Sequence, residues 1–251
     1  MILSNKHIIL THCGDTDCFQ ILKNFGATLH HFPMIDISAK SNIKPFNLSD
    51  FDYYIFTSKN GVNSFFNLDF VKGRKINTLC LGEKTKVALL ENGLEPVFVS
   101  NESYADNLIA ELLNNQMIDN KKVLLVLGNL ADNRIEERLS SICKVTRLDV
   151  YNTNLETKKK KELTTLLKDK NTISIFTSPS SFQAFTSLYG AEKTTLVTIG
   201  TTTSKCIKTS GFASEIISEK QTYEGISKAI INYYETKNIS IWVFQKQDWE
   251  D

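Results

Sequence analysis

The chain has 251 residues, of which 41% are hydrophobic and 23% charged, and its formal net charge is +1. This length suggests one or two domains. The near-neutral charge argues against bulk DNA or RNA as the main partner, since such domains usually carry a large basic excess. No apolar run reaches the roughly 18 residues of a transmembrane helix, and the N-terminus does not resemble a signal peptide. We therefore expect a cytoplasmic protein without a membrane partner.

Short apolar runs alternate with stretches of helical spacing along the chain. Between the runs, apolar side chains recur on one face of a helix, as at Leu108 and Leu112 or at Ile226 and Ile230. This alternation predicts an α/β protein with parallel sheets. In chain order, the predicted strands are residues 7–11, 53–57, 76–81, 122–127, 145–151, 172–177 and 195–199.

Two further stretches have a distinctive composition. The basic run 158–161 is expected to open a helix over 158–167, as a solvated face rather than a nucleic-acid patch. The aromatic stretch 239–244 (ISIWVF) has the alternation of a strand. The sequence leaves open whether that stretch is an edge strand, a docking segment or a disordered end.

The spacing of cysteine and histidine argues against a metal site. The five cysteines are mostly far apart, and the pair Cys13 and Cys18 lacks a second pair at zinc-site spacing. The four histidines form no HExxH motif. Dinucleotide and P-loop fingerprints and the GxSxG elbow are also absent. We expect no metal, and thiols that stay reduced.

An internal repeat is the most informative feature of the sequence. Residues 55–62 (IFTSKNGV) resemble 175–182 (IFTSPSSF), with corresponding threonines 120 positions apart. Residues 81–85 (LGEKT) resemble 199–203 (IGTTT), with the glycines 118 positions apart. A fainter match sets 122–151 against the N-terminal segment. The chain is therefore predicted to form two similar α/β units, and repetition alone suggests a division near residue 118.

Each repeated block contains signals for a helix terminus after a strand. Ser58 and Ser178 are suitable N-caps, and Pro179 suits the first position of a helix. Gly93 and Gly211 are predicted C-caps in the left-handed conformation. An isolated Thr-Ser pair would indicate a cap only. Four helix starts at the carboxyl ends of strands favour an anion site there, where free N–H groups and helix dipoles attract negative charge.

The paired blocks resemble the uroporphyrinogen-III synthase family. The resemblance rests on residues 55–62, 80–85 (CLGEKT), 175–180 (IFTSPS) and 199–203, with 123–151 similar to a family stretch that ends in Val-Tyr. It implies two flavodoxin-like α/β lobes with parallel sheets, joined by a two-stranded linker, with the active site in the cleft between them. One lobe would be discontinuous, formed by residues 1–34 and 153–251, and the other would be 35–152.

The resemblance also implies a reaction that needs no cofactor. Hydroxymethylbilane would be cyclised to uroporphyrinogen III with inversion of ring D and loss of water, a step of haem biosynthesis. Because the substrate carries eight carboxylates, hydroxyls and helix N-termini would hold it. Tyr151 matches the family's cleft tyrosine, which is thought to assist departure of the hydroxyl. The positions that match the family's substrate-binding turns are Thr57, Ser58, Thr85, Ser178, Ser180, Thr202 and Thr203.

Two departures from the family pattern affect the expected substrate contacts. Thr11-His12 stands where the family often has Thr-Arg, and Leu127 precedes a glycine where it often has Arg. Both changes remove a possible carboxylate anchor. An alternative is therefore a two-lobed small-anion binding or regulatory module without catalysis. In either case we expect a monomer that takes a small molecule and binds no nucleic acid.

Overall fold

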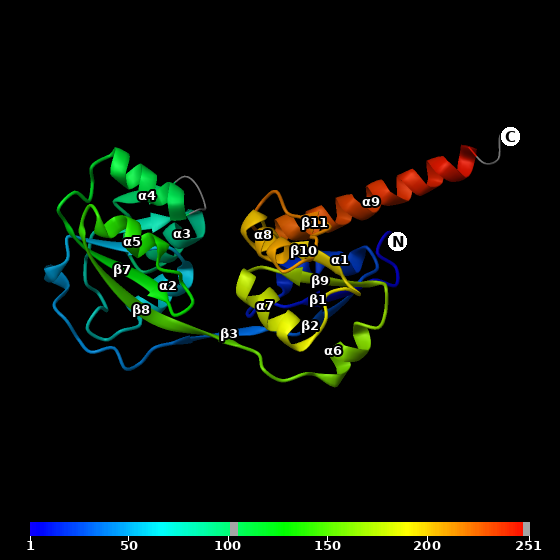
Figure 1. The fold of residues 1–251 in the computed structure, drawn as a ribbon, viewed down its shortest axis with the longest axis horizontal. Coiled ribbons are helices and arrows are strands. Elements are labelled where there is room, and N and C mark those ends of the chain that lie inside the picture. The colour runs from blue at the N-terminus through cyan, green and yellow to red at the C-terminus, as the bar shows by residue number, and fades with distance from the viewer. Residues whose placement is uncertain (101–104, 248–251) are drawn as a thin grey trace. The chain divides into compact units, whose positions relative to one another are not determined.

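The structure, a computed structural model, describes residues 1–100 and 105–247. The chain divides into two compact units, one formed by Met1–Asp36 with Asn154–Asp251 and the other by Ile37–Thr153. Each unit has its own β-sheet with helices on both faces (Figure 1). The predicted α/β class is confirmed. No helix within the described ranges has the length and apolar character needed to cross a membrane.

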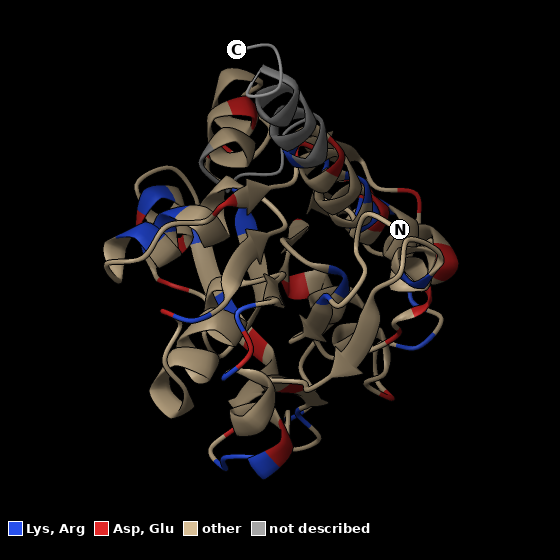
Figure 2. Ribbon diagram, turned by 90° about the vertical axis from the view of Figure 1, so that its right-hand side faces the viewer, with Lys and Arg blue, Asp and Glu red and all other residues tan. Residues whose placement is uncertain are grey.

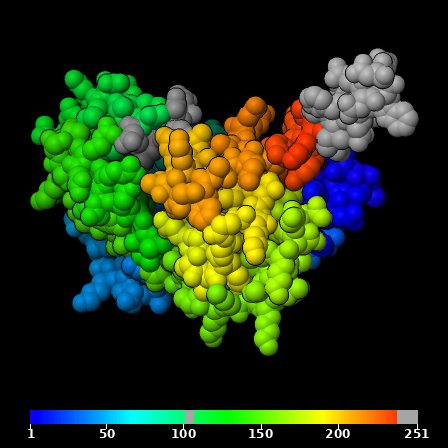
Figure 3. Space-filling view, turned by 45° about the vertical axis from the view of Figure 1, so that its right-hand side comes forward, coloured from blue at the N-terminus to red at the C-terminus, as the bar shows by residue number. Residues whose placement is uncertain are grey.

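The first unit contains a five-stranded sheet in which every neighbouring pair is parallel. One face is covered by α1 (Ile21–Asn24) and α9 (Tyr223–Gln247), and the other by α6 (Lys161–Leu166), α7 (Pro179–Leu188) and α8 (Thr201–Thr209). Helices α7 and α8 lie side by side, yellow to orange in Figure 3. Across the sheet, the strands are β11 (Ile216–Ile217), β10 (Thr195–Thr198), β9 (Thr172–Phe176), β1 (His7–Leu10) and β2 (Thr28–His31).

The second unit contains a six-stranded sheet. Helices α2 (Lys59–Phe66) and α3 (Glu83–Glu91) pack on one face, and α4 (Ala105–Asn114) and α5 (Arg134–Ser140) on the other. The pairs from β8 through to β6 are parallel. Across the sheet, the strands are β3 (Ile35–Ala39), β8 (Lys144–Leu155), β7 (Lys122–Gly128), β4 (Tyr53–Phe56), β5 (Thr78–Leu81) and β6 (Phe98–Ser100).

Successive side chains of the central strands point to opposite faces of the sheet, so each strand contributes to a hydrophobic core on both faces. In β4, Tyr54 and Phe56 join the cluster beneath α2 and α3, whereas Ile55 joins the cluster beneath α4 and α5. In β1, Ile8 and Leu10 face α1 and α9, whereas Ile9 faces the opposite cluster. Strands buried on both faces read as continuous apolar runs, which is why the sequence predicts them well.

The sheets explain the internal repeat. The order β6-β5-β4-β7-β8 in one unit corresponds to β11-β10-β9-β1-β2 in the other. In this correspondence, the repeated blocks are β4 to α3 and β9 to α8, and the N-terminal strands β1 and β2 take the places of β7 and β8. The units therefore share one arrangement with a permuted chain start, so the repeat period does not mark the boundary between units.

Strands β3 and β8 lie side by side where the chain passes between units. Lys40 N donates to Val150 O at 2.8 Å, and Glu156 N donates to Met34 O at 2.9 Å. The later residue on the β3 side therefore pairs with the earlier residue on the β8 side, so the two strands are antiparallel. These strands form the two-stranded linker. The exact residue limits of the lobes and the active-site cleft remain predictions.

One local prediction is wrong, and one alternative that the sequence left open is excluded. Residues 239–244 belong to helix α9 and not to a strand, because a six-residue apolar run is ambiguous by period and a long preceding helix propagates easily. The basic run largely precedes its helix, since α6 begins at Lys161. Lys160 N instead donates to Tyr189 Oη at 2.6 Å.

Candidate functional site

The turns after β4 and β9 have nearly the same geometry. Ser58 lies at φ −155° and ψ 151°, and Ser178 at φ −157° and ψ 155°. Ser58 Oγ accepts from Gly61 N at 3.1 Å, and Ser178 Oγ accepts from Ser181 N at 3.2 Å. Both predicted N-caps are confirmed, and Pro179 occupies the first turn of its helix. Each turn brings a hydroxyl to the carboxyl end of a central strand, next to a helix N-terminus.

The second pair of helices, α3 and α8, is matched at the C-terminal end, whereas the N-cap glycines Gly82 and Gly200 differ in φ, at 75° and 174°. Gly93 and Gly211 have φ of 75° and 87°, so the predicted left-handed C-caps are confirmed. The amide after each glycine donates back to the helix, Leu94 N to Leu89 O at 3.0 Å and Phe212 N to Ile207 O at 3.1 Å. These bonds satisfy carbonyls at the helix ends. Each of these helices begins directly after the carboxyl end of a strand, α3 after β5 and α8 after β10.

The predicted binding hydroxyls differ in accessibility. Thr85 and Thr203 are 3% and 2% exposed and pack inside their units. Thr202 is exposed, whereas Thr57 and Ser180 are half-buried. Ser180 Oγ lies 3.0 Å from Ser178 Oγ. Thr202 and the two serines are therefore better placed to meet a ligand than the two buried threonines.

Tyr151 and Ser58 come together in the second unit. Strands β7 and β8 pair Leu127 with Asp149 and then Gly128 with Tyr151, which leaves Val150 as an extra residue in a bulge. A bulge of this kind changes the direction of the following side chain. Tyr151 Oη lies 3.3 Å from Ser58 Oγ. The tyrosine ring lies against Gly128, where a Cβ would overlap its Cζ and Cε2 atoms.

The two departures from the family pattern are structural here. His12 is 2% exposed, with its ring centroid 5.4 Å from that of Phe19 and 4.7 Å from that of Tyr223. Its Nε2 lies 2.9 Å from Asp15 O, which fits a donated ring N–H. Burial raises the pKa of Tyr223 above its ordinary value. Leu127, at 2% exposure, lies in the core. Neither position presents a group to an anion.

One equivalent residue was not among the predicted site residues. Thr177 occupies in the β9 turn the place that Thr57 has in the β4 turn, and both are half-buried. The 120-residue offset of the repeat was sufficient to identify Thr177. The Gly128 contact with Tyr151, in contrast, depends on the bulge, for which the sequence carries no signal.

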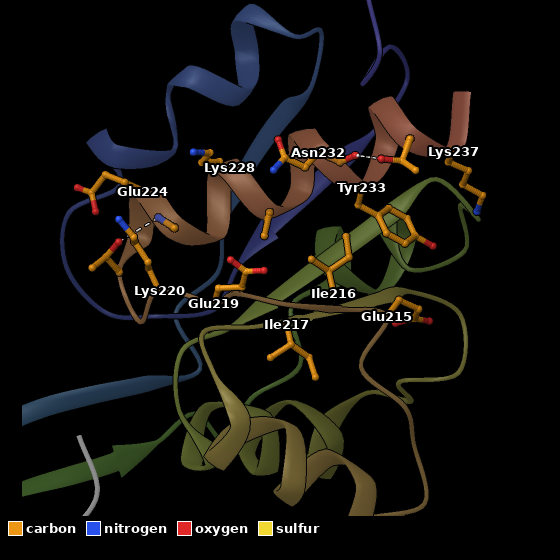
Figure 4. A pocket seen from close by; sticks show the side chains of 14 residues that line it. Glu215, Ile216, Ile217, Glu219, Lys220, Glu224, Lys228, Asn232, Tyr233 and Lys237 are labelled. Carbon is orange, nitrogen blue, oxygen red and sulfur yellow. Dashed lines mark hydrogen bonds between the residues drawn. The ribbon is translucent and has the colours of Figure 1, made fainter. Parts of the chain in front are cut away.

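A pocket of about 940 Å³ lies in the first unit between α9 and the segment around β11 (Figure 4). Lys228 and Tyr233 line it from the helix, and Ile217 and Glu219 from the opposite side. None of the predicted site residues lines this pocket. Among the described side chains, no group of three or more His, Cys, Asp or Glu is arranged to hold a metal ion.

The fold and these turns define a class of protein: a two-unit, doubly wound α/β protein with hydroxyls and helix N-termini at the carboxyl ends of its strands. Comparison with known families identifies the particular one. The profile described as uroporphyrinogen-III synthase HemD matches residues 19–228. The chain therefore belongs to this family.

Solved structures show the same fold. Uroporphyrinogen-III synthetase from Helicobacter pylori 26695 is 21% identical, with a TM-score of 0.68 over 91% of this chain and 99% of that one. A mutant uroporphyrinogen III synthase from the extremely thermophilic bacterium Thermus thermophilus is 15% identical, with a TM-score of 0.63 over 92% and 99% of the two chains. No curated protein matches the sequence.

Proposed function

We propose that this chain is a cofactor-independent uroporphyrinogen-III synthase, a lyase that cyclises hydroxymethylbilane with inversion of ring D and loss of water. Family membership supports this assignment. The observation that carries it is the Tyr151 hydroxyl, 3.3 Å from Ser58 Oγ at the carboxyl end of its sheet. This is the region of an open α/β sheet where ligands bind.

The hydroxyl network suggests how Tyr151 acts. Ser58 Oγ accepts a hydrogen bond from Gly61 N, which leaves its own O–H to donate to Tyr151 Oη. The phenol O–H is then directed away from Ser58 and can donate to the hydroxyl that leaves the substrate. Departure of that hydroxyl leaves a cationic azafulvene, which closes the ring through a spirocyclic intermediate. Hydrogen bonding to the leaving oxygen lowers the barrier to the first step.

The remaining task is to hold a flexible polyanion in one conformation, since uncatalysed closure gives the type I isomer. We propose that hydroxyls and backbone N–H groups at the starts of α2, α3, α7 and α8 bind the carboxylates. The net charge of +1 is consistent with binding by such neutral donors. Lys and Arg are interspersed with Asp and Glu along the ribbon (Figure 2). The proposed side-chain donors are Thr57, Ser58, Ser178, Ser180 and Thr202. Thr85 and Thr203 are buried, so we propose that these two positions contribute through the helix N-termini of α3 and α8 in which they lie.

We further propose that the enzyme is a cytoplasmic monomer whose partner is its small substrate and not a nucleic acid. The test of function is isomer analysis. The protein is incubated with enzymatically generated hydroxymethylbilane, and the product is oxidised and separated. Predominantly type III isomer supports the assignment. Type I isomer alone, at high protein concentration, would overturn it in favour of an anion-binding module without catalysis.

A further inference from the structure

A partly buried arginine lies on the same strand as Tyr151 in the second unit. Arg147, whose side chain is 17% exposed, projects from β8 four residues before the tyrosine. Its Nε donates to Asp149 Oδ1 at 2.9 Å, and its two terminal nitrogens reach Asn133 Oδ1 and Ala131 O, also at 2.9 Å. A longer bond of 3.4 Å reaches Gly128 O. One guanidinium thus ties β8 to the turn formed by residues 128–133.

The same turn supports the tyrosine. Asn129 N donates to Tyr151 O at 3.1 Å, and Asn129 Oδ1 accepts from Thr153 N at 2.8 Å. Gly128, the first residue of the turn, lies against the Tyr151 ring at a distance that a Cβ would not permit. The position of the ring is therefore coupled to the position of the turn.

We propose that Arg147 is a positioning residue, which acts on the Tyr151 hydroxyl through the turn 128–133. The inference rests on the proposed cyclase function and makes it more specific. A guanidinium can satisfy several acceptors in one plane, whereas an ammonium cannot. Without Arg147 the turn is free to shift, and the ring against Gly128 shifts with it. The hydroxyl then leaves its place beside Ser58 Oγ.

Kinetics of a double-mutant cycle test this coupling. Arg147→Met is expected to lower kcat roughly tenfold, part of the about 10² to 10⁴-fold that a well-placed proton donor contributes, with KM nearly unchanged. In a Tyr151→Phe background, Arg147→Met should lower kcat no further. Arg134→Met is the matched control, because Arg134 belongs to the same region but is 74% exposed and donates to Asp132. Equal losses of kcat in both backgrounds would overturn the proposal.

A second measurement does not require activity. In protein labelled with 3-fluorotyrosine, the Tyr151 resonance is assigned by its loss in Tyr151→Phe. Arg147→Met should shift or broaden this ¹⁹F resonance, and Arg134→Met should leave it in place. An unchanged resonance in Arg147→Met would overturn the positioning role. If the wild-type protein forms only type I isomer, the proposed function fails, and the ¹⁹F comparison still decides whether Arg147 positions Tyr151.

Discussion

Tyr151 Oη lies 3.3 Å from Ser58 Oγ, which connects the bulged strand β8 to the N-cap of helix α2. The two residues are 93 positions apart in the sequence. Ser58 Oγ accepts a hydrogen bond from Gly61 N, so its own O–H can still donate a hydrogen bond to another group. This arrangement makes one serine both a helix cap and a partner of the proposed catalytic tyrosine.

Ser58→Ala and Ser178→Ala separate these two roles. Each variant loses one N-cap bond and should be destabilised by about 1 kcal/mol, which thermal unfolding can measure. Only Ser58→Ala also removes the partner of Tyr151. Ser58→Ala should therefore lower kcat several-fold, whereas Ser178→Ala should chiefly raise KM. An equal loss of kcat in the two variants would contradict a specific role for Ser58.

The cysteines should differ sharply in reactivity. Burial raises the pKa of Cys80 to about 12 and that of Cys143 to about 11, and only the thiolate is nucleophilic. The pKa of Cys18 is also raised, chiefly by its hydrogen bond with Glu224, and that of Cys206 is raised by burial, but these thiols and Cys13 are partly exposed. At about pH 8, iodoacetamide should therefore modify these three cysteines of the native protein first. Peptide mass spectrometry gives the order of labelling. Early modification of Cys80 without unfolding would contradict the buried position.

His30 should make stability depend on pH. Burial, and then the neighbouring His7, hold the pKa of His30 below its ordinary value of 6.5, and His7 Nδ1 lies 3.1 Å from His30 Nε2. The folded state therefore binds fewer protons than the unfolded chain, so stability falls as the pH drops below about 6.5. Thermal unfolding between about pH 7 and pH 5 measures this dependence.

His30→Gln should flatten the pH dependence, because the group that resists protonation is gone. His31→Gln is the matched control: it lies on the same strand, β2, and its replacement retains the His7–His30 pair. A pH dependence that is unchanged in His30→Gln would exclude His30 as its source.

The sequence predicted the central parallel strands and failed at the edges. Strands β4, β7 and β9 are buried on both faces, so their apolar runs are continuous. The strands that the apolar runs did not predict, β2, β3, β6 and β11, all lie at the edge of a sheet, although the family resemblance had implied β3 as a linker strand. Edge strands are short and half-exposed, so they contain few apolar residues and show little alternation of apolar and polar side chains.

For the site, too, local features could be predicted from the sequence and long-range contacts could not. The caps at Ser58 and Ser178 follow from local chemistry, and the repeat places them in equivalent turns. The contacts of Tyr151 depend on the bulge at Val150 and on the close approach to Gly128. The proposed role of Arg147 depends on the turn 128–133, which follows β7 and is hydrogen-bonded to β8. Such long-range geometry leaves no mark in residue spacing.

The rate of type III isomer formation by Tyr151→Phe tests the account most directly. The substitution removes one hydroxyl and retains the ring that lies against Gly128. We expect kcat to fall at least about tenfold, with little change in melting temperature and type III still the main enzymatic product. A turnover equal to that of the wild-type protein would remove Tyr151 from the reaction and contradict the account.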